Sequence, residues 1–226
     1  MGKRQETRDR IEAQIIELGR RHLVTQGAAG LSLRAIARDL GMVSSAVYRY
    51  VANRDELLTL LLVDAYTDLG NAVSRAQCEA GGPWREQVRA IAHAARDWAI
   101  AAPSSWALLY GSPVPGYQAP AERTVGPGTR MVAALFSAVD AGLAAGELKT
   151  GGVEVPQPLS SDFASLRDEF SFTGDDALMV RSVTLWAGLV GAISLEAFGQ
   201  YGHDTVTDPR ILFDLQVGLL LDLMTG

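Results

Sequence analysis

Apolar residues recur through most of this chain at spacings of three and four, which place side chains on one face of an α-helix. The clearest case lies between two prolines, where the apolar positions are Trp84, Val88, Ile91, Ala95 and Trp98. No long stretch alternates apolar and polar residues in the manner of a half-buried strand. The pattern therefore predicts an all-α protein of about nine or ten helices.

Glycine, proline and capping residues divide the predicted helices. Ser32 is a natural N-cap, and Asn53 with Glu56 three residues later resembles a capping box. Residues 111–120, GSPVPGYQAP, are too rich in proline and glycine for a helix and predict an exposed loop or lid. We expect helices over residues 7–25, 33–40, 54–77, 83–102, 104–110, 162–170, 175–199 and 208–224, and from residue 122 or 129 to 145.

Residues 31–58, LSLRAIARDLGMVSSAVYRYVANRDELL, have the spacing of a helix-turn-helix. Two short helices that cross tightly need a small inner residue, a turn residue that tolerates positive φ, and an aliphatic side chain that projects back between them. Ala37, Gly41 and Val47 have these properties, four and six residues apart. An ordinary αα-hairpin closed by a glycine is the alternative. The residues expected to face outward, where a major groove could receive them, are Ser44, Ser45, Tyr48 and Arg49.

The net charge of −6 is divided unevenly along the chain. Residues 1–54 contain ten Lys/Arg and five Asp/Glu, a net +5, whereas residues 55–226 have a net −11. A basic segment on an acidic chain indicates an anionic partner for that segment, either nucleic acid or a membrane surface, although a solvated face is the simpler alternative. Four arginines surround the Gly41 turn, namely Arg34, Arg38, Arg49 and Arg54.

These motifs together resemble the N-terminal domain of the TetR family of bacterial transcriptional repressors. The resemblance covers residues 7–64: a helix ending at a glycine, LRAIA after Ser32, then Gly41, VYRY at 47–50 and NRDELL at 53–58. The rest of the chain resembles the family's ligand-binding and dimerisation domain in length and helix count. The segments SPVPGY at 112–117 and WAG at 186–188 also resemble one subgroup of the family.

The resemblance implies DNA contacts position by position. Tyr48 and Arg54 would contact phosphates, and Ser32 would cap a helix whose N-terminus faces a further phosphate. Arg38 is expected to be a solvated or backbone-facing charge. The candidates for contact with base edges are Arg34, Ser44, Ser45 and Arg49.

Three positions depart from the family pattern. Val43 stands where a Ser or Thr commonly caps the recognition helix, which costs about 1 kcal/mol unless Ser44 takes over the cap. His22 stands where an aliphatic residue is usual and is interpreted as a histidine at the edge of the core, with a pH-dependent role as the alternative. Val51 replaces a frequent aromatic residue.

A chain of 226 residues has room for one small and one larger domain. We expect residues 1–53 to form the helix-turn-helix DNA-binding domain. Residues 54–226 would form the helical ligand-binding and dimerisation domain, with the helix at 54–77 connecting the two.

The last two predicted helices have more apolar surface than contact within one chain needs, and their small residues would allow close approach across a two-fold axis. A monomeric core is the alternative. The residues expected at a homodimer interface are Leu185, Gly188, Leu189, Ala192, Leu212, Leu215 and Leu219.

Aromatic residues gather in the middle helices. A packed core explains them, but the family resemblance adds the expectation of an effector pocket with residues 111–120 near its mouth. The residues expected to line it are Trp98, Trp106, Leu109, Tyr110 and Phe136.

The sequence gives an enzyme little support. His22, His93 and His203 lie far apart, and HExxH, GxSxG, CxxC and glycine-rich phosphate-loop motifs are missing. Asp97 and Glu196 sit in apolar helices and are expected to be partnered structural charges, with pocket polarity as the alternative. We therefore expect no catalytic residue, no metal and no cofactor.

Location is predicted from absences in the sequence. The two most apolar segments, 183–198 and 211–224, contain acidic residues and are shorter than the roughly 20 residues that cross a bilayer. The N-terminus lacks an apolar signal core, and the single cysteine, Cys78, cannot form an internal disulfide. These features predict a cytoplasmic protein with no membrane partner.

The expected function is a ligand-responsive transcriptional repressor that binds a palindromic operator in double-stranded DNA as a homodimer. A small apolar or aromatic effector would release it by preferring a conformer that does not fit the operator. The alternative is a helical small-molecule-binding protein, or an activator with the same fold.

Overall fold

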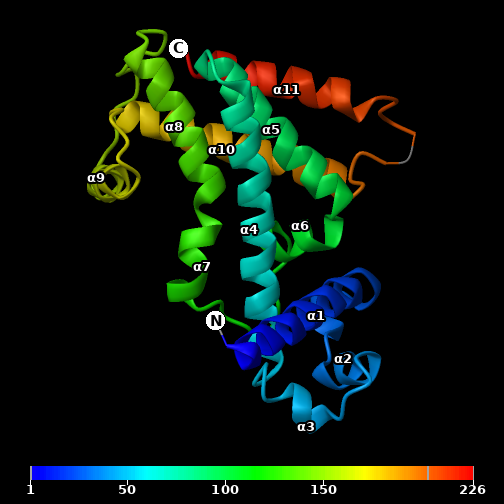
Figure 1. Cartoon of the computed structure of the whole chain (residues 1–226). Helices are drawn as coiled ribbons and strands as arrows, with labels where there is room; N and C mark the ends of the chain where they lie inside the picture. The colour runs from blue at the N-terminus through cyan, green and yellow to red at the C-terminus, as the bar shows by residue number, and fades with distance from the viewer. Residues whose placement is uncertain (1, 203, 226) are drawn as a thin grey trace. The chain divides into compact units, whose positions relative to one another are not determined.

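The computed structural model describes residues 2–202 and 204–225, and these residues form helices joined by turns and loops (Figure 1). The predicted all-α fold is confirmed. Of the two starts predicted for the helix ending at residue 145, the one at residue 129 agrees with the helix Arg130–Ala144, and a separate helix at Ala121–Gly128 precedes it because proline and glycines end that helix before Thr129. In chain order the elements are α1 (Lys3–Gln26), the 3₁₀ turn η1 (Ala28–Gly30), α2 (Leu33–Asp39), α3 (Ser44–Val47), α4 (Arg54–Ala80), α5 (Trp84–Ala101), α6 (Pro103–Tyr110), α7 (Ala121–Gly128), α8 (Arg130–Ala144), α9 (Leu159–Phe170), α10 (Asp176–Ala197) and α11 (Pro209–Leu223).

The chain divides into two compact units. The first unit contains the described residues up to Asp68 together with Ala102–Gly128, and the second contains Leu69–Ala101 and the described residues from Thr129 onward. The division reflects compactness and not independent folding, so the predicted domain boundary between residues 53 and 54 stays a prediction.

The first unit is built around aliphatic side chains of α1, α2, α3 and α4. Ile15, Ile36 and Val47 are fully buried in this core. An ion-pair network also joins α1 to α4, since Arg20 donates to Asp64 through Nε and to Asp68 through Nη2, each at 2.6 Å. Bonding to Asp64 and the nearby Asp68 charge raise the pKa of Arg20, so the guanidinium stays charged.

The second unit packs α5 against α8, α10 and α11. Its helices approach closely where Gly142 of α8 meets Trp84, since a Cβ at this glycine would lie 2.6 Å from the indole ring. Across the unit, Arg96 of α5 bonds Glu196 of α10, and both side chains are largely buried. The structure thus supplies the partner that the sequence predicted for Glu196.

The helix predicted at residues 175–199 is α10, whose bounds agree closely with the prediction. α10 spans 22 residues, and by length and composition alone it could cross a membrane. The apolar segment judged too short to cross a bilayer covers only residues 183–198, whereas the whole helix begins at Asp176, after an N-cap in which the Asp175 carboxylate accepts from the Leu178 amide. Several of its side chains are buried in the second unit, as in the core helix of a globular protein.

Candidate DNA-binding surface

The helix-turn-helix has the local geometry predicted from its spacing. The Ser32 hydroxyl accepts a hydrogen bond from the Ala35 amide at 3.4 Å, which caps α2. Gly41 has φ of +65°, a value that glycine adopts without steric penalty, and this allows the turn into α3. Ala37 and Val47 are buried between the helices. The buried face therefore fixes which side of α3 remains outside.

The outward face is polar, as predicted. Ser45 and Arg49 are exposed, Tyr48 is 45% exposed, and Ser44 is half-buried. On α2, the side chain of Arg34 is also exposed. A convex helical surface with hydroxyl and guanidinium groups can donate to phosphates and to base edges in a major groove.

The entrance to α3 lacks a side-chain cap. Val43 occupies the N-cap position, forms no such hydrogen bond and is 71% exposed. Ser44 does not replace it, because its hydroxyl has no hydrogen-bond partner among the described residues. The first amides of α3 therefore keep donor capacity for another group, and only four residues are α-helical at this point.

Arg54 has partners that the sequence did not suggest. Its Nη2 donates to the carbonyl oxygens of Ala28 at 2.9 Å and Ala29 at 3.3 Å, which joins the start of α4 to the turn after α1. The side chain thus orders the base of the helix-turn-helix. Its predicted phosphate contact stays a prediction, for which the remaining guanidinium hydrogens are the donors.

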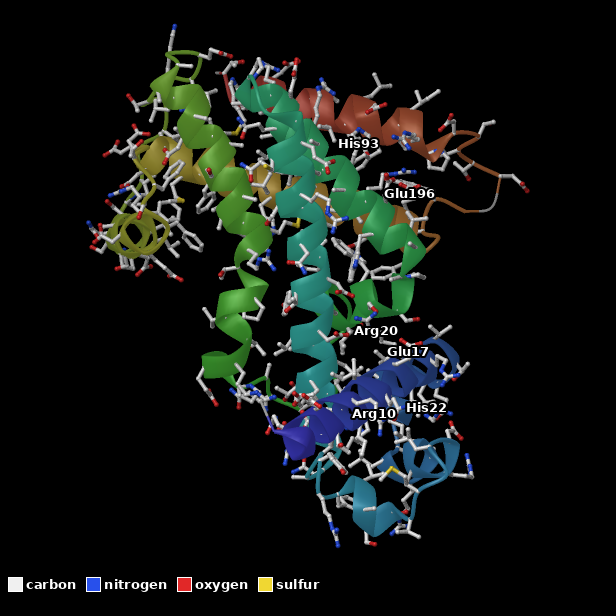
Figure 2. All side chains as sticks on the ribbon, in the orientation of Figure 1. Arg10, Glu17, Arg20, His22, His93 and Glu196 are labelled. Carbon is white, nitrogen blue, oxygen red and sulfur yellow. The ribbon has the colours of Figure 1, made fainter. Side chains whose placement is uncertain are left out.

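His22 is a structural residue at the edge of the core. It is only 7% exposed, and its Nε2 lies 2.7 Å from Oδ2 of Asp39, the last residue of α2. This bond lowers the pKa of Asp39, because it favours the carboxylate form. Figure 2 shows His22 on the side of α1 that faces α2, with Arg20 on the other side. The sequence identified the histidine but gave no signal for its partner.

The predicted lid belongs to the first unit. Val114 and Tyr117 pack against the helix-turn-helix core, and the Tyr117 hydroxyl lies 2.9 Å from the Thr59 hydroxyl on α4. Nearby, Nη1 of Arg123 on α7 donates to both carboxylate oxygens of Glu56, at 2.9 and 2.8 Å. Residues 111–120 therefore pack against the helices of the DNA-binding unit and stabilise them. Their proline and glycine content alone did not indicate this role.

The five predicted pocket residues fall in different units. In the first unit Trp106 is fully buried, and its ring centroid lies 4.4 Å from that of Tyr110, with Leu109 half-buried between them in sequence. In the second unit Phe136 is buried, and its ring centroid lies 5.2 Å from the ring centroids of Phe170 and Phe172. Trp98, also in this unit, is half-buried. A shared pocket stays a prediction.

The predicted dimerisation residues have different environments. Leu185, Leu189 and Ala192 are buried within the second unit, and Gly188 lies against Leu220, so these residues form contacts inside one chain. Leu212 is half-buried. By contrast, α11 has four aliphatic side chains at every fourth position that are all well exposed, and they include the predicted Leu215 and Leu219. This α11 stripe consists of Ile211, Leu215, Leu219 and Leu223.

Known proteins similar to this chain are transcriptional regulators. The family model for bacterial regulatory proteins of the tetR family matches residues 15–61, and the model for the tetracyclin repressor-like C-terminal domain matches residues 88–220. The HTH-type transcriptional regulators Mb1846 of Mycobacterium bovis and Rv1816 of Mycobacterium tuberculosis are each 59% identical over 225 residues, 99% of this chain and 96% of each relative.

Solved structures show the same fold. The crystal structure of SCO4313 superposes with a TM-score of 0.78 at 29% identity, over 98% of this chain and 100% of that one. A protein of unknown function from Rhodococcus sp. RHA1 superposes with a TM-score of 0.72 at 21% identity, over 95% of each chain.

Proposed function

Because this chain belongs to the tetR family of helix-turn-helix transcriptional regulators, and not to a family of enzymes, we propose that it is a ligand-responsive repressor. It would bind a palindromic operator as a homodimer in the cytoplasm, where bacterial DNA lies. The observation that carries this proposal is that α3 buries Val47 fully on one face and leaves its other, polar face exposed.

In the proposed complex the outward face of α3 enters the major groove. The hydroxyls of Ser44 and Ser45 and the guanidinium of Arg34 would meet base edges, since hydroxyl and guanidinium groups hydrogen-bond to the acceptors displayed there. Tyr48 and Arg54 would contact flanking phosphates, and the capped end of α2 at Ser32 would face another. Backbone contacts would set the register while base contacts would supply the sequence preference.

The homodimer is supported by the α11 stripe. Large aliphatic side chains exposed at every fourth position form one continuous apolar face along a helix. A soluble chain rarely leaves such a face open to water, and a two-fold axis would bury it against its own copy. Two helix-turn-helix units in one dimer would then read two half-sites, and this explains the expectation of a palindrome.

Release by an effector is supported by the family and by the aromatic residues of the helices. One structural neighbour, FadR of Bacillus subtilis, was solved in complex with stearoyl-CoA, and at 14% identity and a TM-score of 0.62 it shares only the fold with this chain. Because Trp106 and Phe136 are buried, an apolar effector would have to open the packing at Trp106 and Tyr110 or in the cluster around Phe136. The effector must prefer the conformer that does not bind DNA, because equal affinity for both conformers would shift nothing.

Selection from random duplex DNA with the full chain tests this function. We expect a palindromic motif whose binding weakens as salt rises. Addition of apolar small molecules, assayed by mobility shift on the selected site, should identify compounds that release the DNA. Failure to select any motif would contradict a role as a sequence-specific repressor.

A further inference from the structure

A groove of about 740 Å³ in the first unit lies between the first turns of α1 and the residues that follow α3. Among the lining residues that the structure describes, the two charged ones are both arginines, one from α1 and one from the residues that follow α3. The lining residues are Gly2, Gln5, Thr7, Arg8, Arg49 and Tyr50.

Arg8 is held in position along this groove. Its Nε lies 2.7 Å from Oε1 of Glu12, one turn further along α1, and its Cζ lies 5.9 Å from the centre of the Tyr50 ring. The side chain is nonetheless 50% exposed, so its Nη groups remain available as donors to a ligand. An arginine fixed in this way loses little side-chain entropy when it binds an oxyanion.

Arg49 completes the cationic lining. Its side chain is exposed and forms no ion pair with any residue that the structure describes. Two guanidinium groups lie along a groove in which the described lining residues include no carboxylate, so a phosphodiester is attracted there even though Glu12 pairs with Nε of Arg8.

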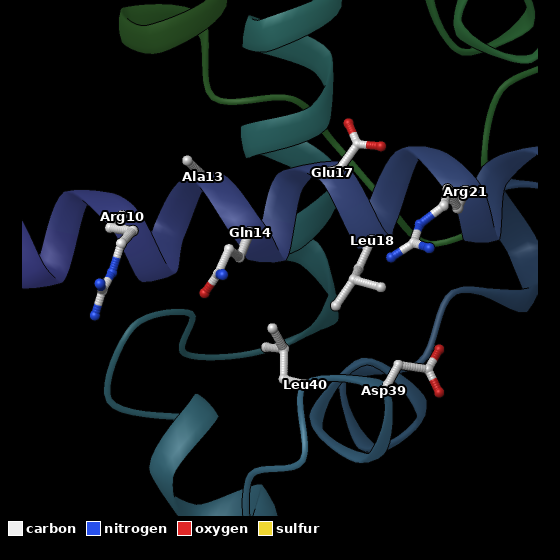
Figure 3. Close-up of a pocket in the computed structure, with 8 residues that line it drawn as sticks. All are labelled: Arg10, Ala13, Gln14, Glu17, Leu18, Arg21, Asp39 and Leu40. Carbon is white, nitrogen blue, oxygen red and sulfur yellow. The ribbon is translucent and has the colours of Figure 1, made fainter.

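A second groove along the same helix has a different charge pattern. It measures about 510 Å³ and lies between α1 and α2 (Figure 3). Arg10 and Arg21 line it together with the carboxylates of Glu17 and Asp39. These carboxylates would repel an anion, so arginines on α1 do not by themselves make a phosphate site.

We infer that Arg8 and Arg49 form a site for the DNA sugar-phosphate backbone beside the segment read by α3. This inference rests on the proposed function and adds α1 to its contacts. The sequence made Arg49 a candidate for contact with base edges, and this inference assigns it to the DNA backbone instead. The site extends each half-site contact beyond α3 and contributes affinity without sequence preference.

The test measures the dissociation constants of full-length Arg8→Ala and Arg49→Ala proteins on the selected duplex and on an unrelated duplex of equal length, across a salt series. Each variant should lose roughly 10- to 100-fold affinity on both duplexes, because the lost contact is to the backbone and occurs twice in a dimer. A plot of the logarithm of the association constant against the logarithm of the salt concentration should become shallower by about 2, because each phosphate contact contributes about 0.9 to the slope and the dimer loses two contacts. Unchanged affinity and slope for Arg8→Ala would overturn the inference.

Two control variants separate a DNA contact from a structural role. Glu12→Gln removes the carboxylate charge but keeps an oxygen that can accept from Nε of Arg8, so Arg8 stays in position and DNA binding should be unchanged or tighter; a loss equal to that of Arg8→Ala would mean that Arg8 only stabilises the helix, and would overturn the inference. Arg10→Ala removes the same charge from the groove that contains carboxylates, so its slope should change by well under half as much. An equal change in slope would show a general charge effect and would also overturn it.

The role of Arg49 and the proposed function are tested separately. If Arg49→Ala loses affinity only on the selected duplex, then Arg49 reads a base and the shared backbone site is wrong. If the wild-type protein selects no motif, the proposed repressor function fails, but the salt slopes on unrelated DNA still decide whether Arg8 and Arg49 bind the backbone.

Discussion

Replacement of one leucine on α11 tests how the homodimer forms. Leu219 is 67% exposed in the single chain, so most of its apolar surface is available to a partner. Full burial of a leucine contributes about 1.5 to 3 kcal/mol, and two-thirds of this is about 1 to 2 kcal/mol. Alanine retains part of that surface, so Leu219→Ala should cost about 1 to 1.5 kcal/mol per protomer. Because a two-fold interface contains the residue twice, the free energy of dimerisation should become less favourable by about 2 to 3 kcal/mol. The dissociation constant of the dimer should therefore rise roughly 30- to 150-fold.

Sedimentation velocity over a concentration series measures this dissociation constant directly. Because Leu219 is exposed, the helix content and thermal unfolding of the dissociated chain should stay unchanged in the variant. Val153→Ala provides the matched control, since Val153 is a half-exposed aliphatic residue outside α11 and its loss should leave the dimer intact. Leu221→Ala should behave in the opposite way, with a fold destabilised by about 2 to 5 kcal/mol, because Leu221 is fully buried. A Leu219→Ala protein that dimerises as tightly as the wild type would refute the α11 interface.

Three further predictions concern the fold and the DNA-binding unit. Gly142→Ala places a methyl group 2.6 Å from the Trp84 ring and should destabilise the chain by about 1 to 3 kcal/mol in urea unfolding, whereas unchanged stability would mean that α8 can shift. The hydrogen bond from His22 lowers the pKa of Asp39 in the folded chain. This bond therefore stabilises the fold at pH values above the ordinary pKa of 3.8, and the stabilisation is lost as pH falls through the lower pKa of the folded state. Urea unfolding at a series of pH values should show this loss of stability in the wild type but not in Asp39→Asn. If the free energy of unfolding depends on pH in the same way in both proteins, the loss does not come from Asp39. Tyr117→Phe removes the hydrogen bond to α4 and should cost about 1 kcal/mol in thermal unfolding, which an unaltered melting temperature would contradict.

The helix-turn-helix was predictable because its determinants are local in the sequence. The cap at Ser32, the positive φ of Gly41 and the inward position of Val47 depend on residues within one or two helical turns of each other. Local spacing therefore decides both the turn and the face of α3 that stays outside. The missing cap at Val43 was predicted for the same reason, since the residue type itself excludes the hydrogen bond.

The partners of polar and charged side chains were not predictable, because the two members of each pair lie far apart in the sequence. His22 bonds Asp39, Arg54 bonds the carbonyl of Ala28, and Tyr117 reaches α4 across 58 residues. Residue type shows that each group needs a partner when it is buried, but many residues along the chain could supply one. Only tertiary packing selects among them.

The sequence by itself determined that the last two helices are apolar, and the tertiary structure decided which of their residues remain outside. Leucine and valine occur on more than one side of α11, so periodicity could not separate buried Val217 and Leu221 from exposed Leu215 and Leu219. The packing of α5 and α10 against one side of α11 makes that choice. The physical reason is that helical propensity and hydrophobicity belong to residues in their local sequence, whereas exposure depends on which other helices a given face contacts.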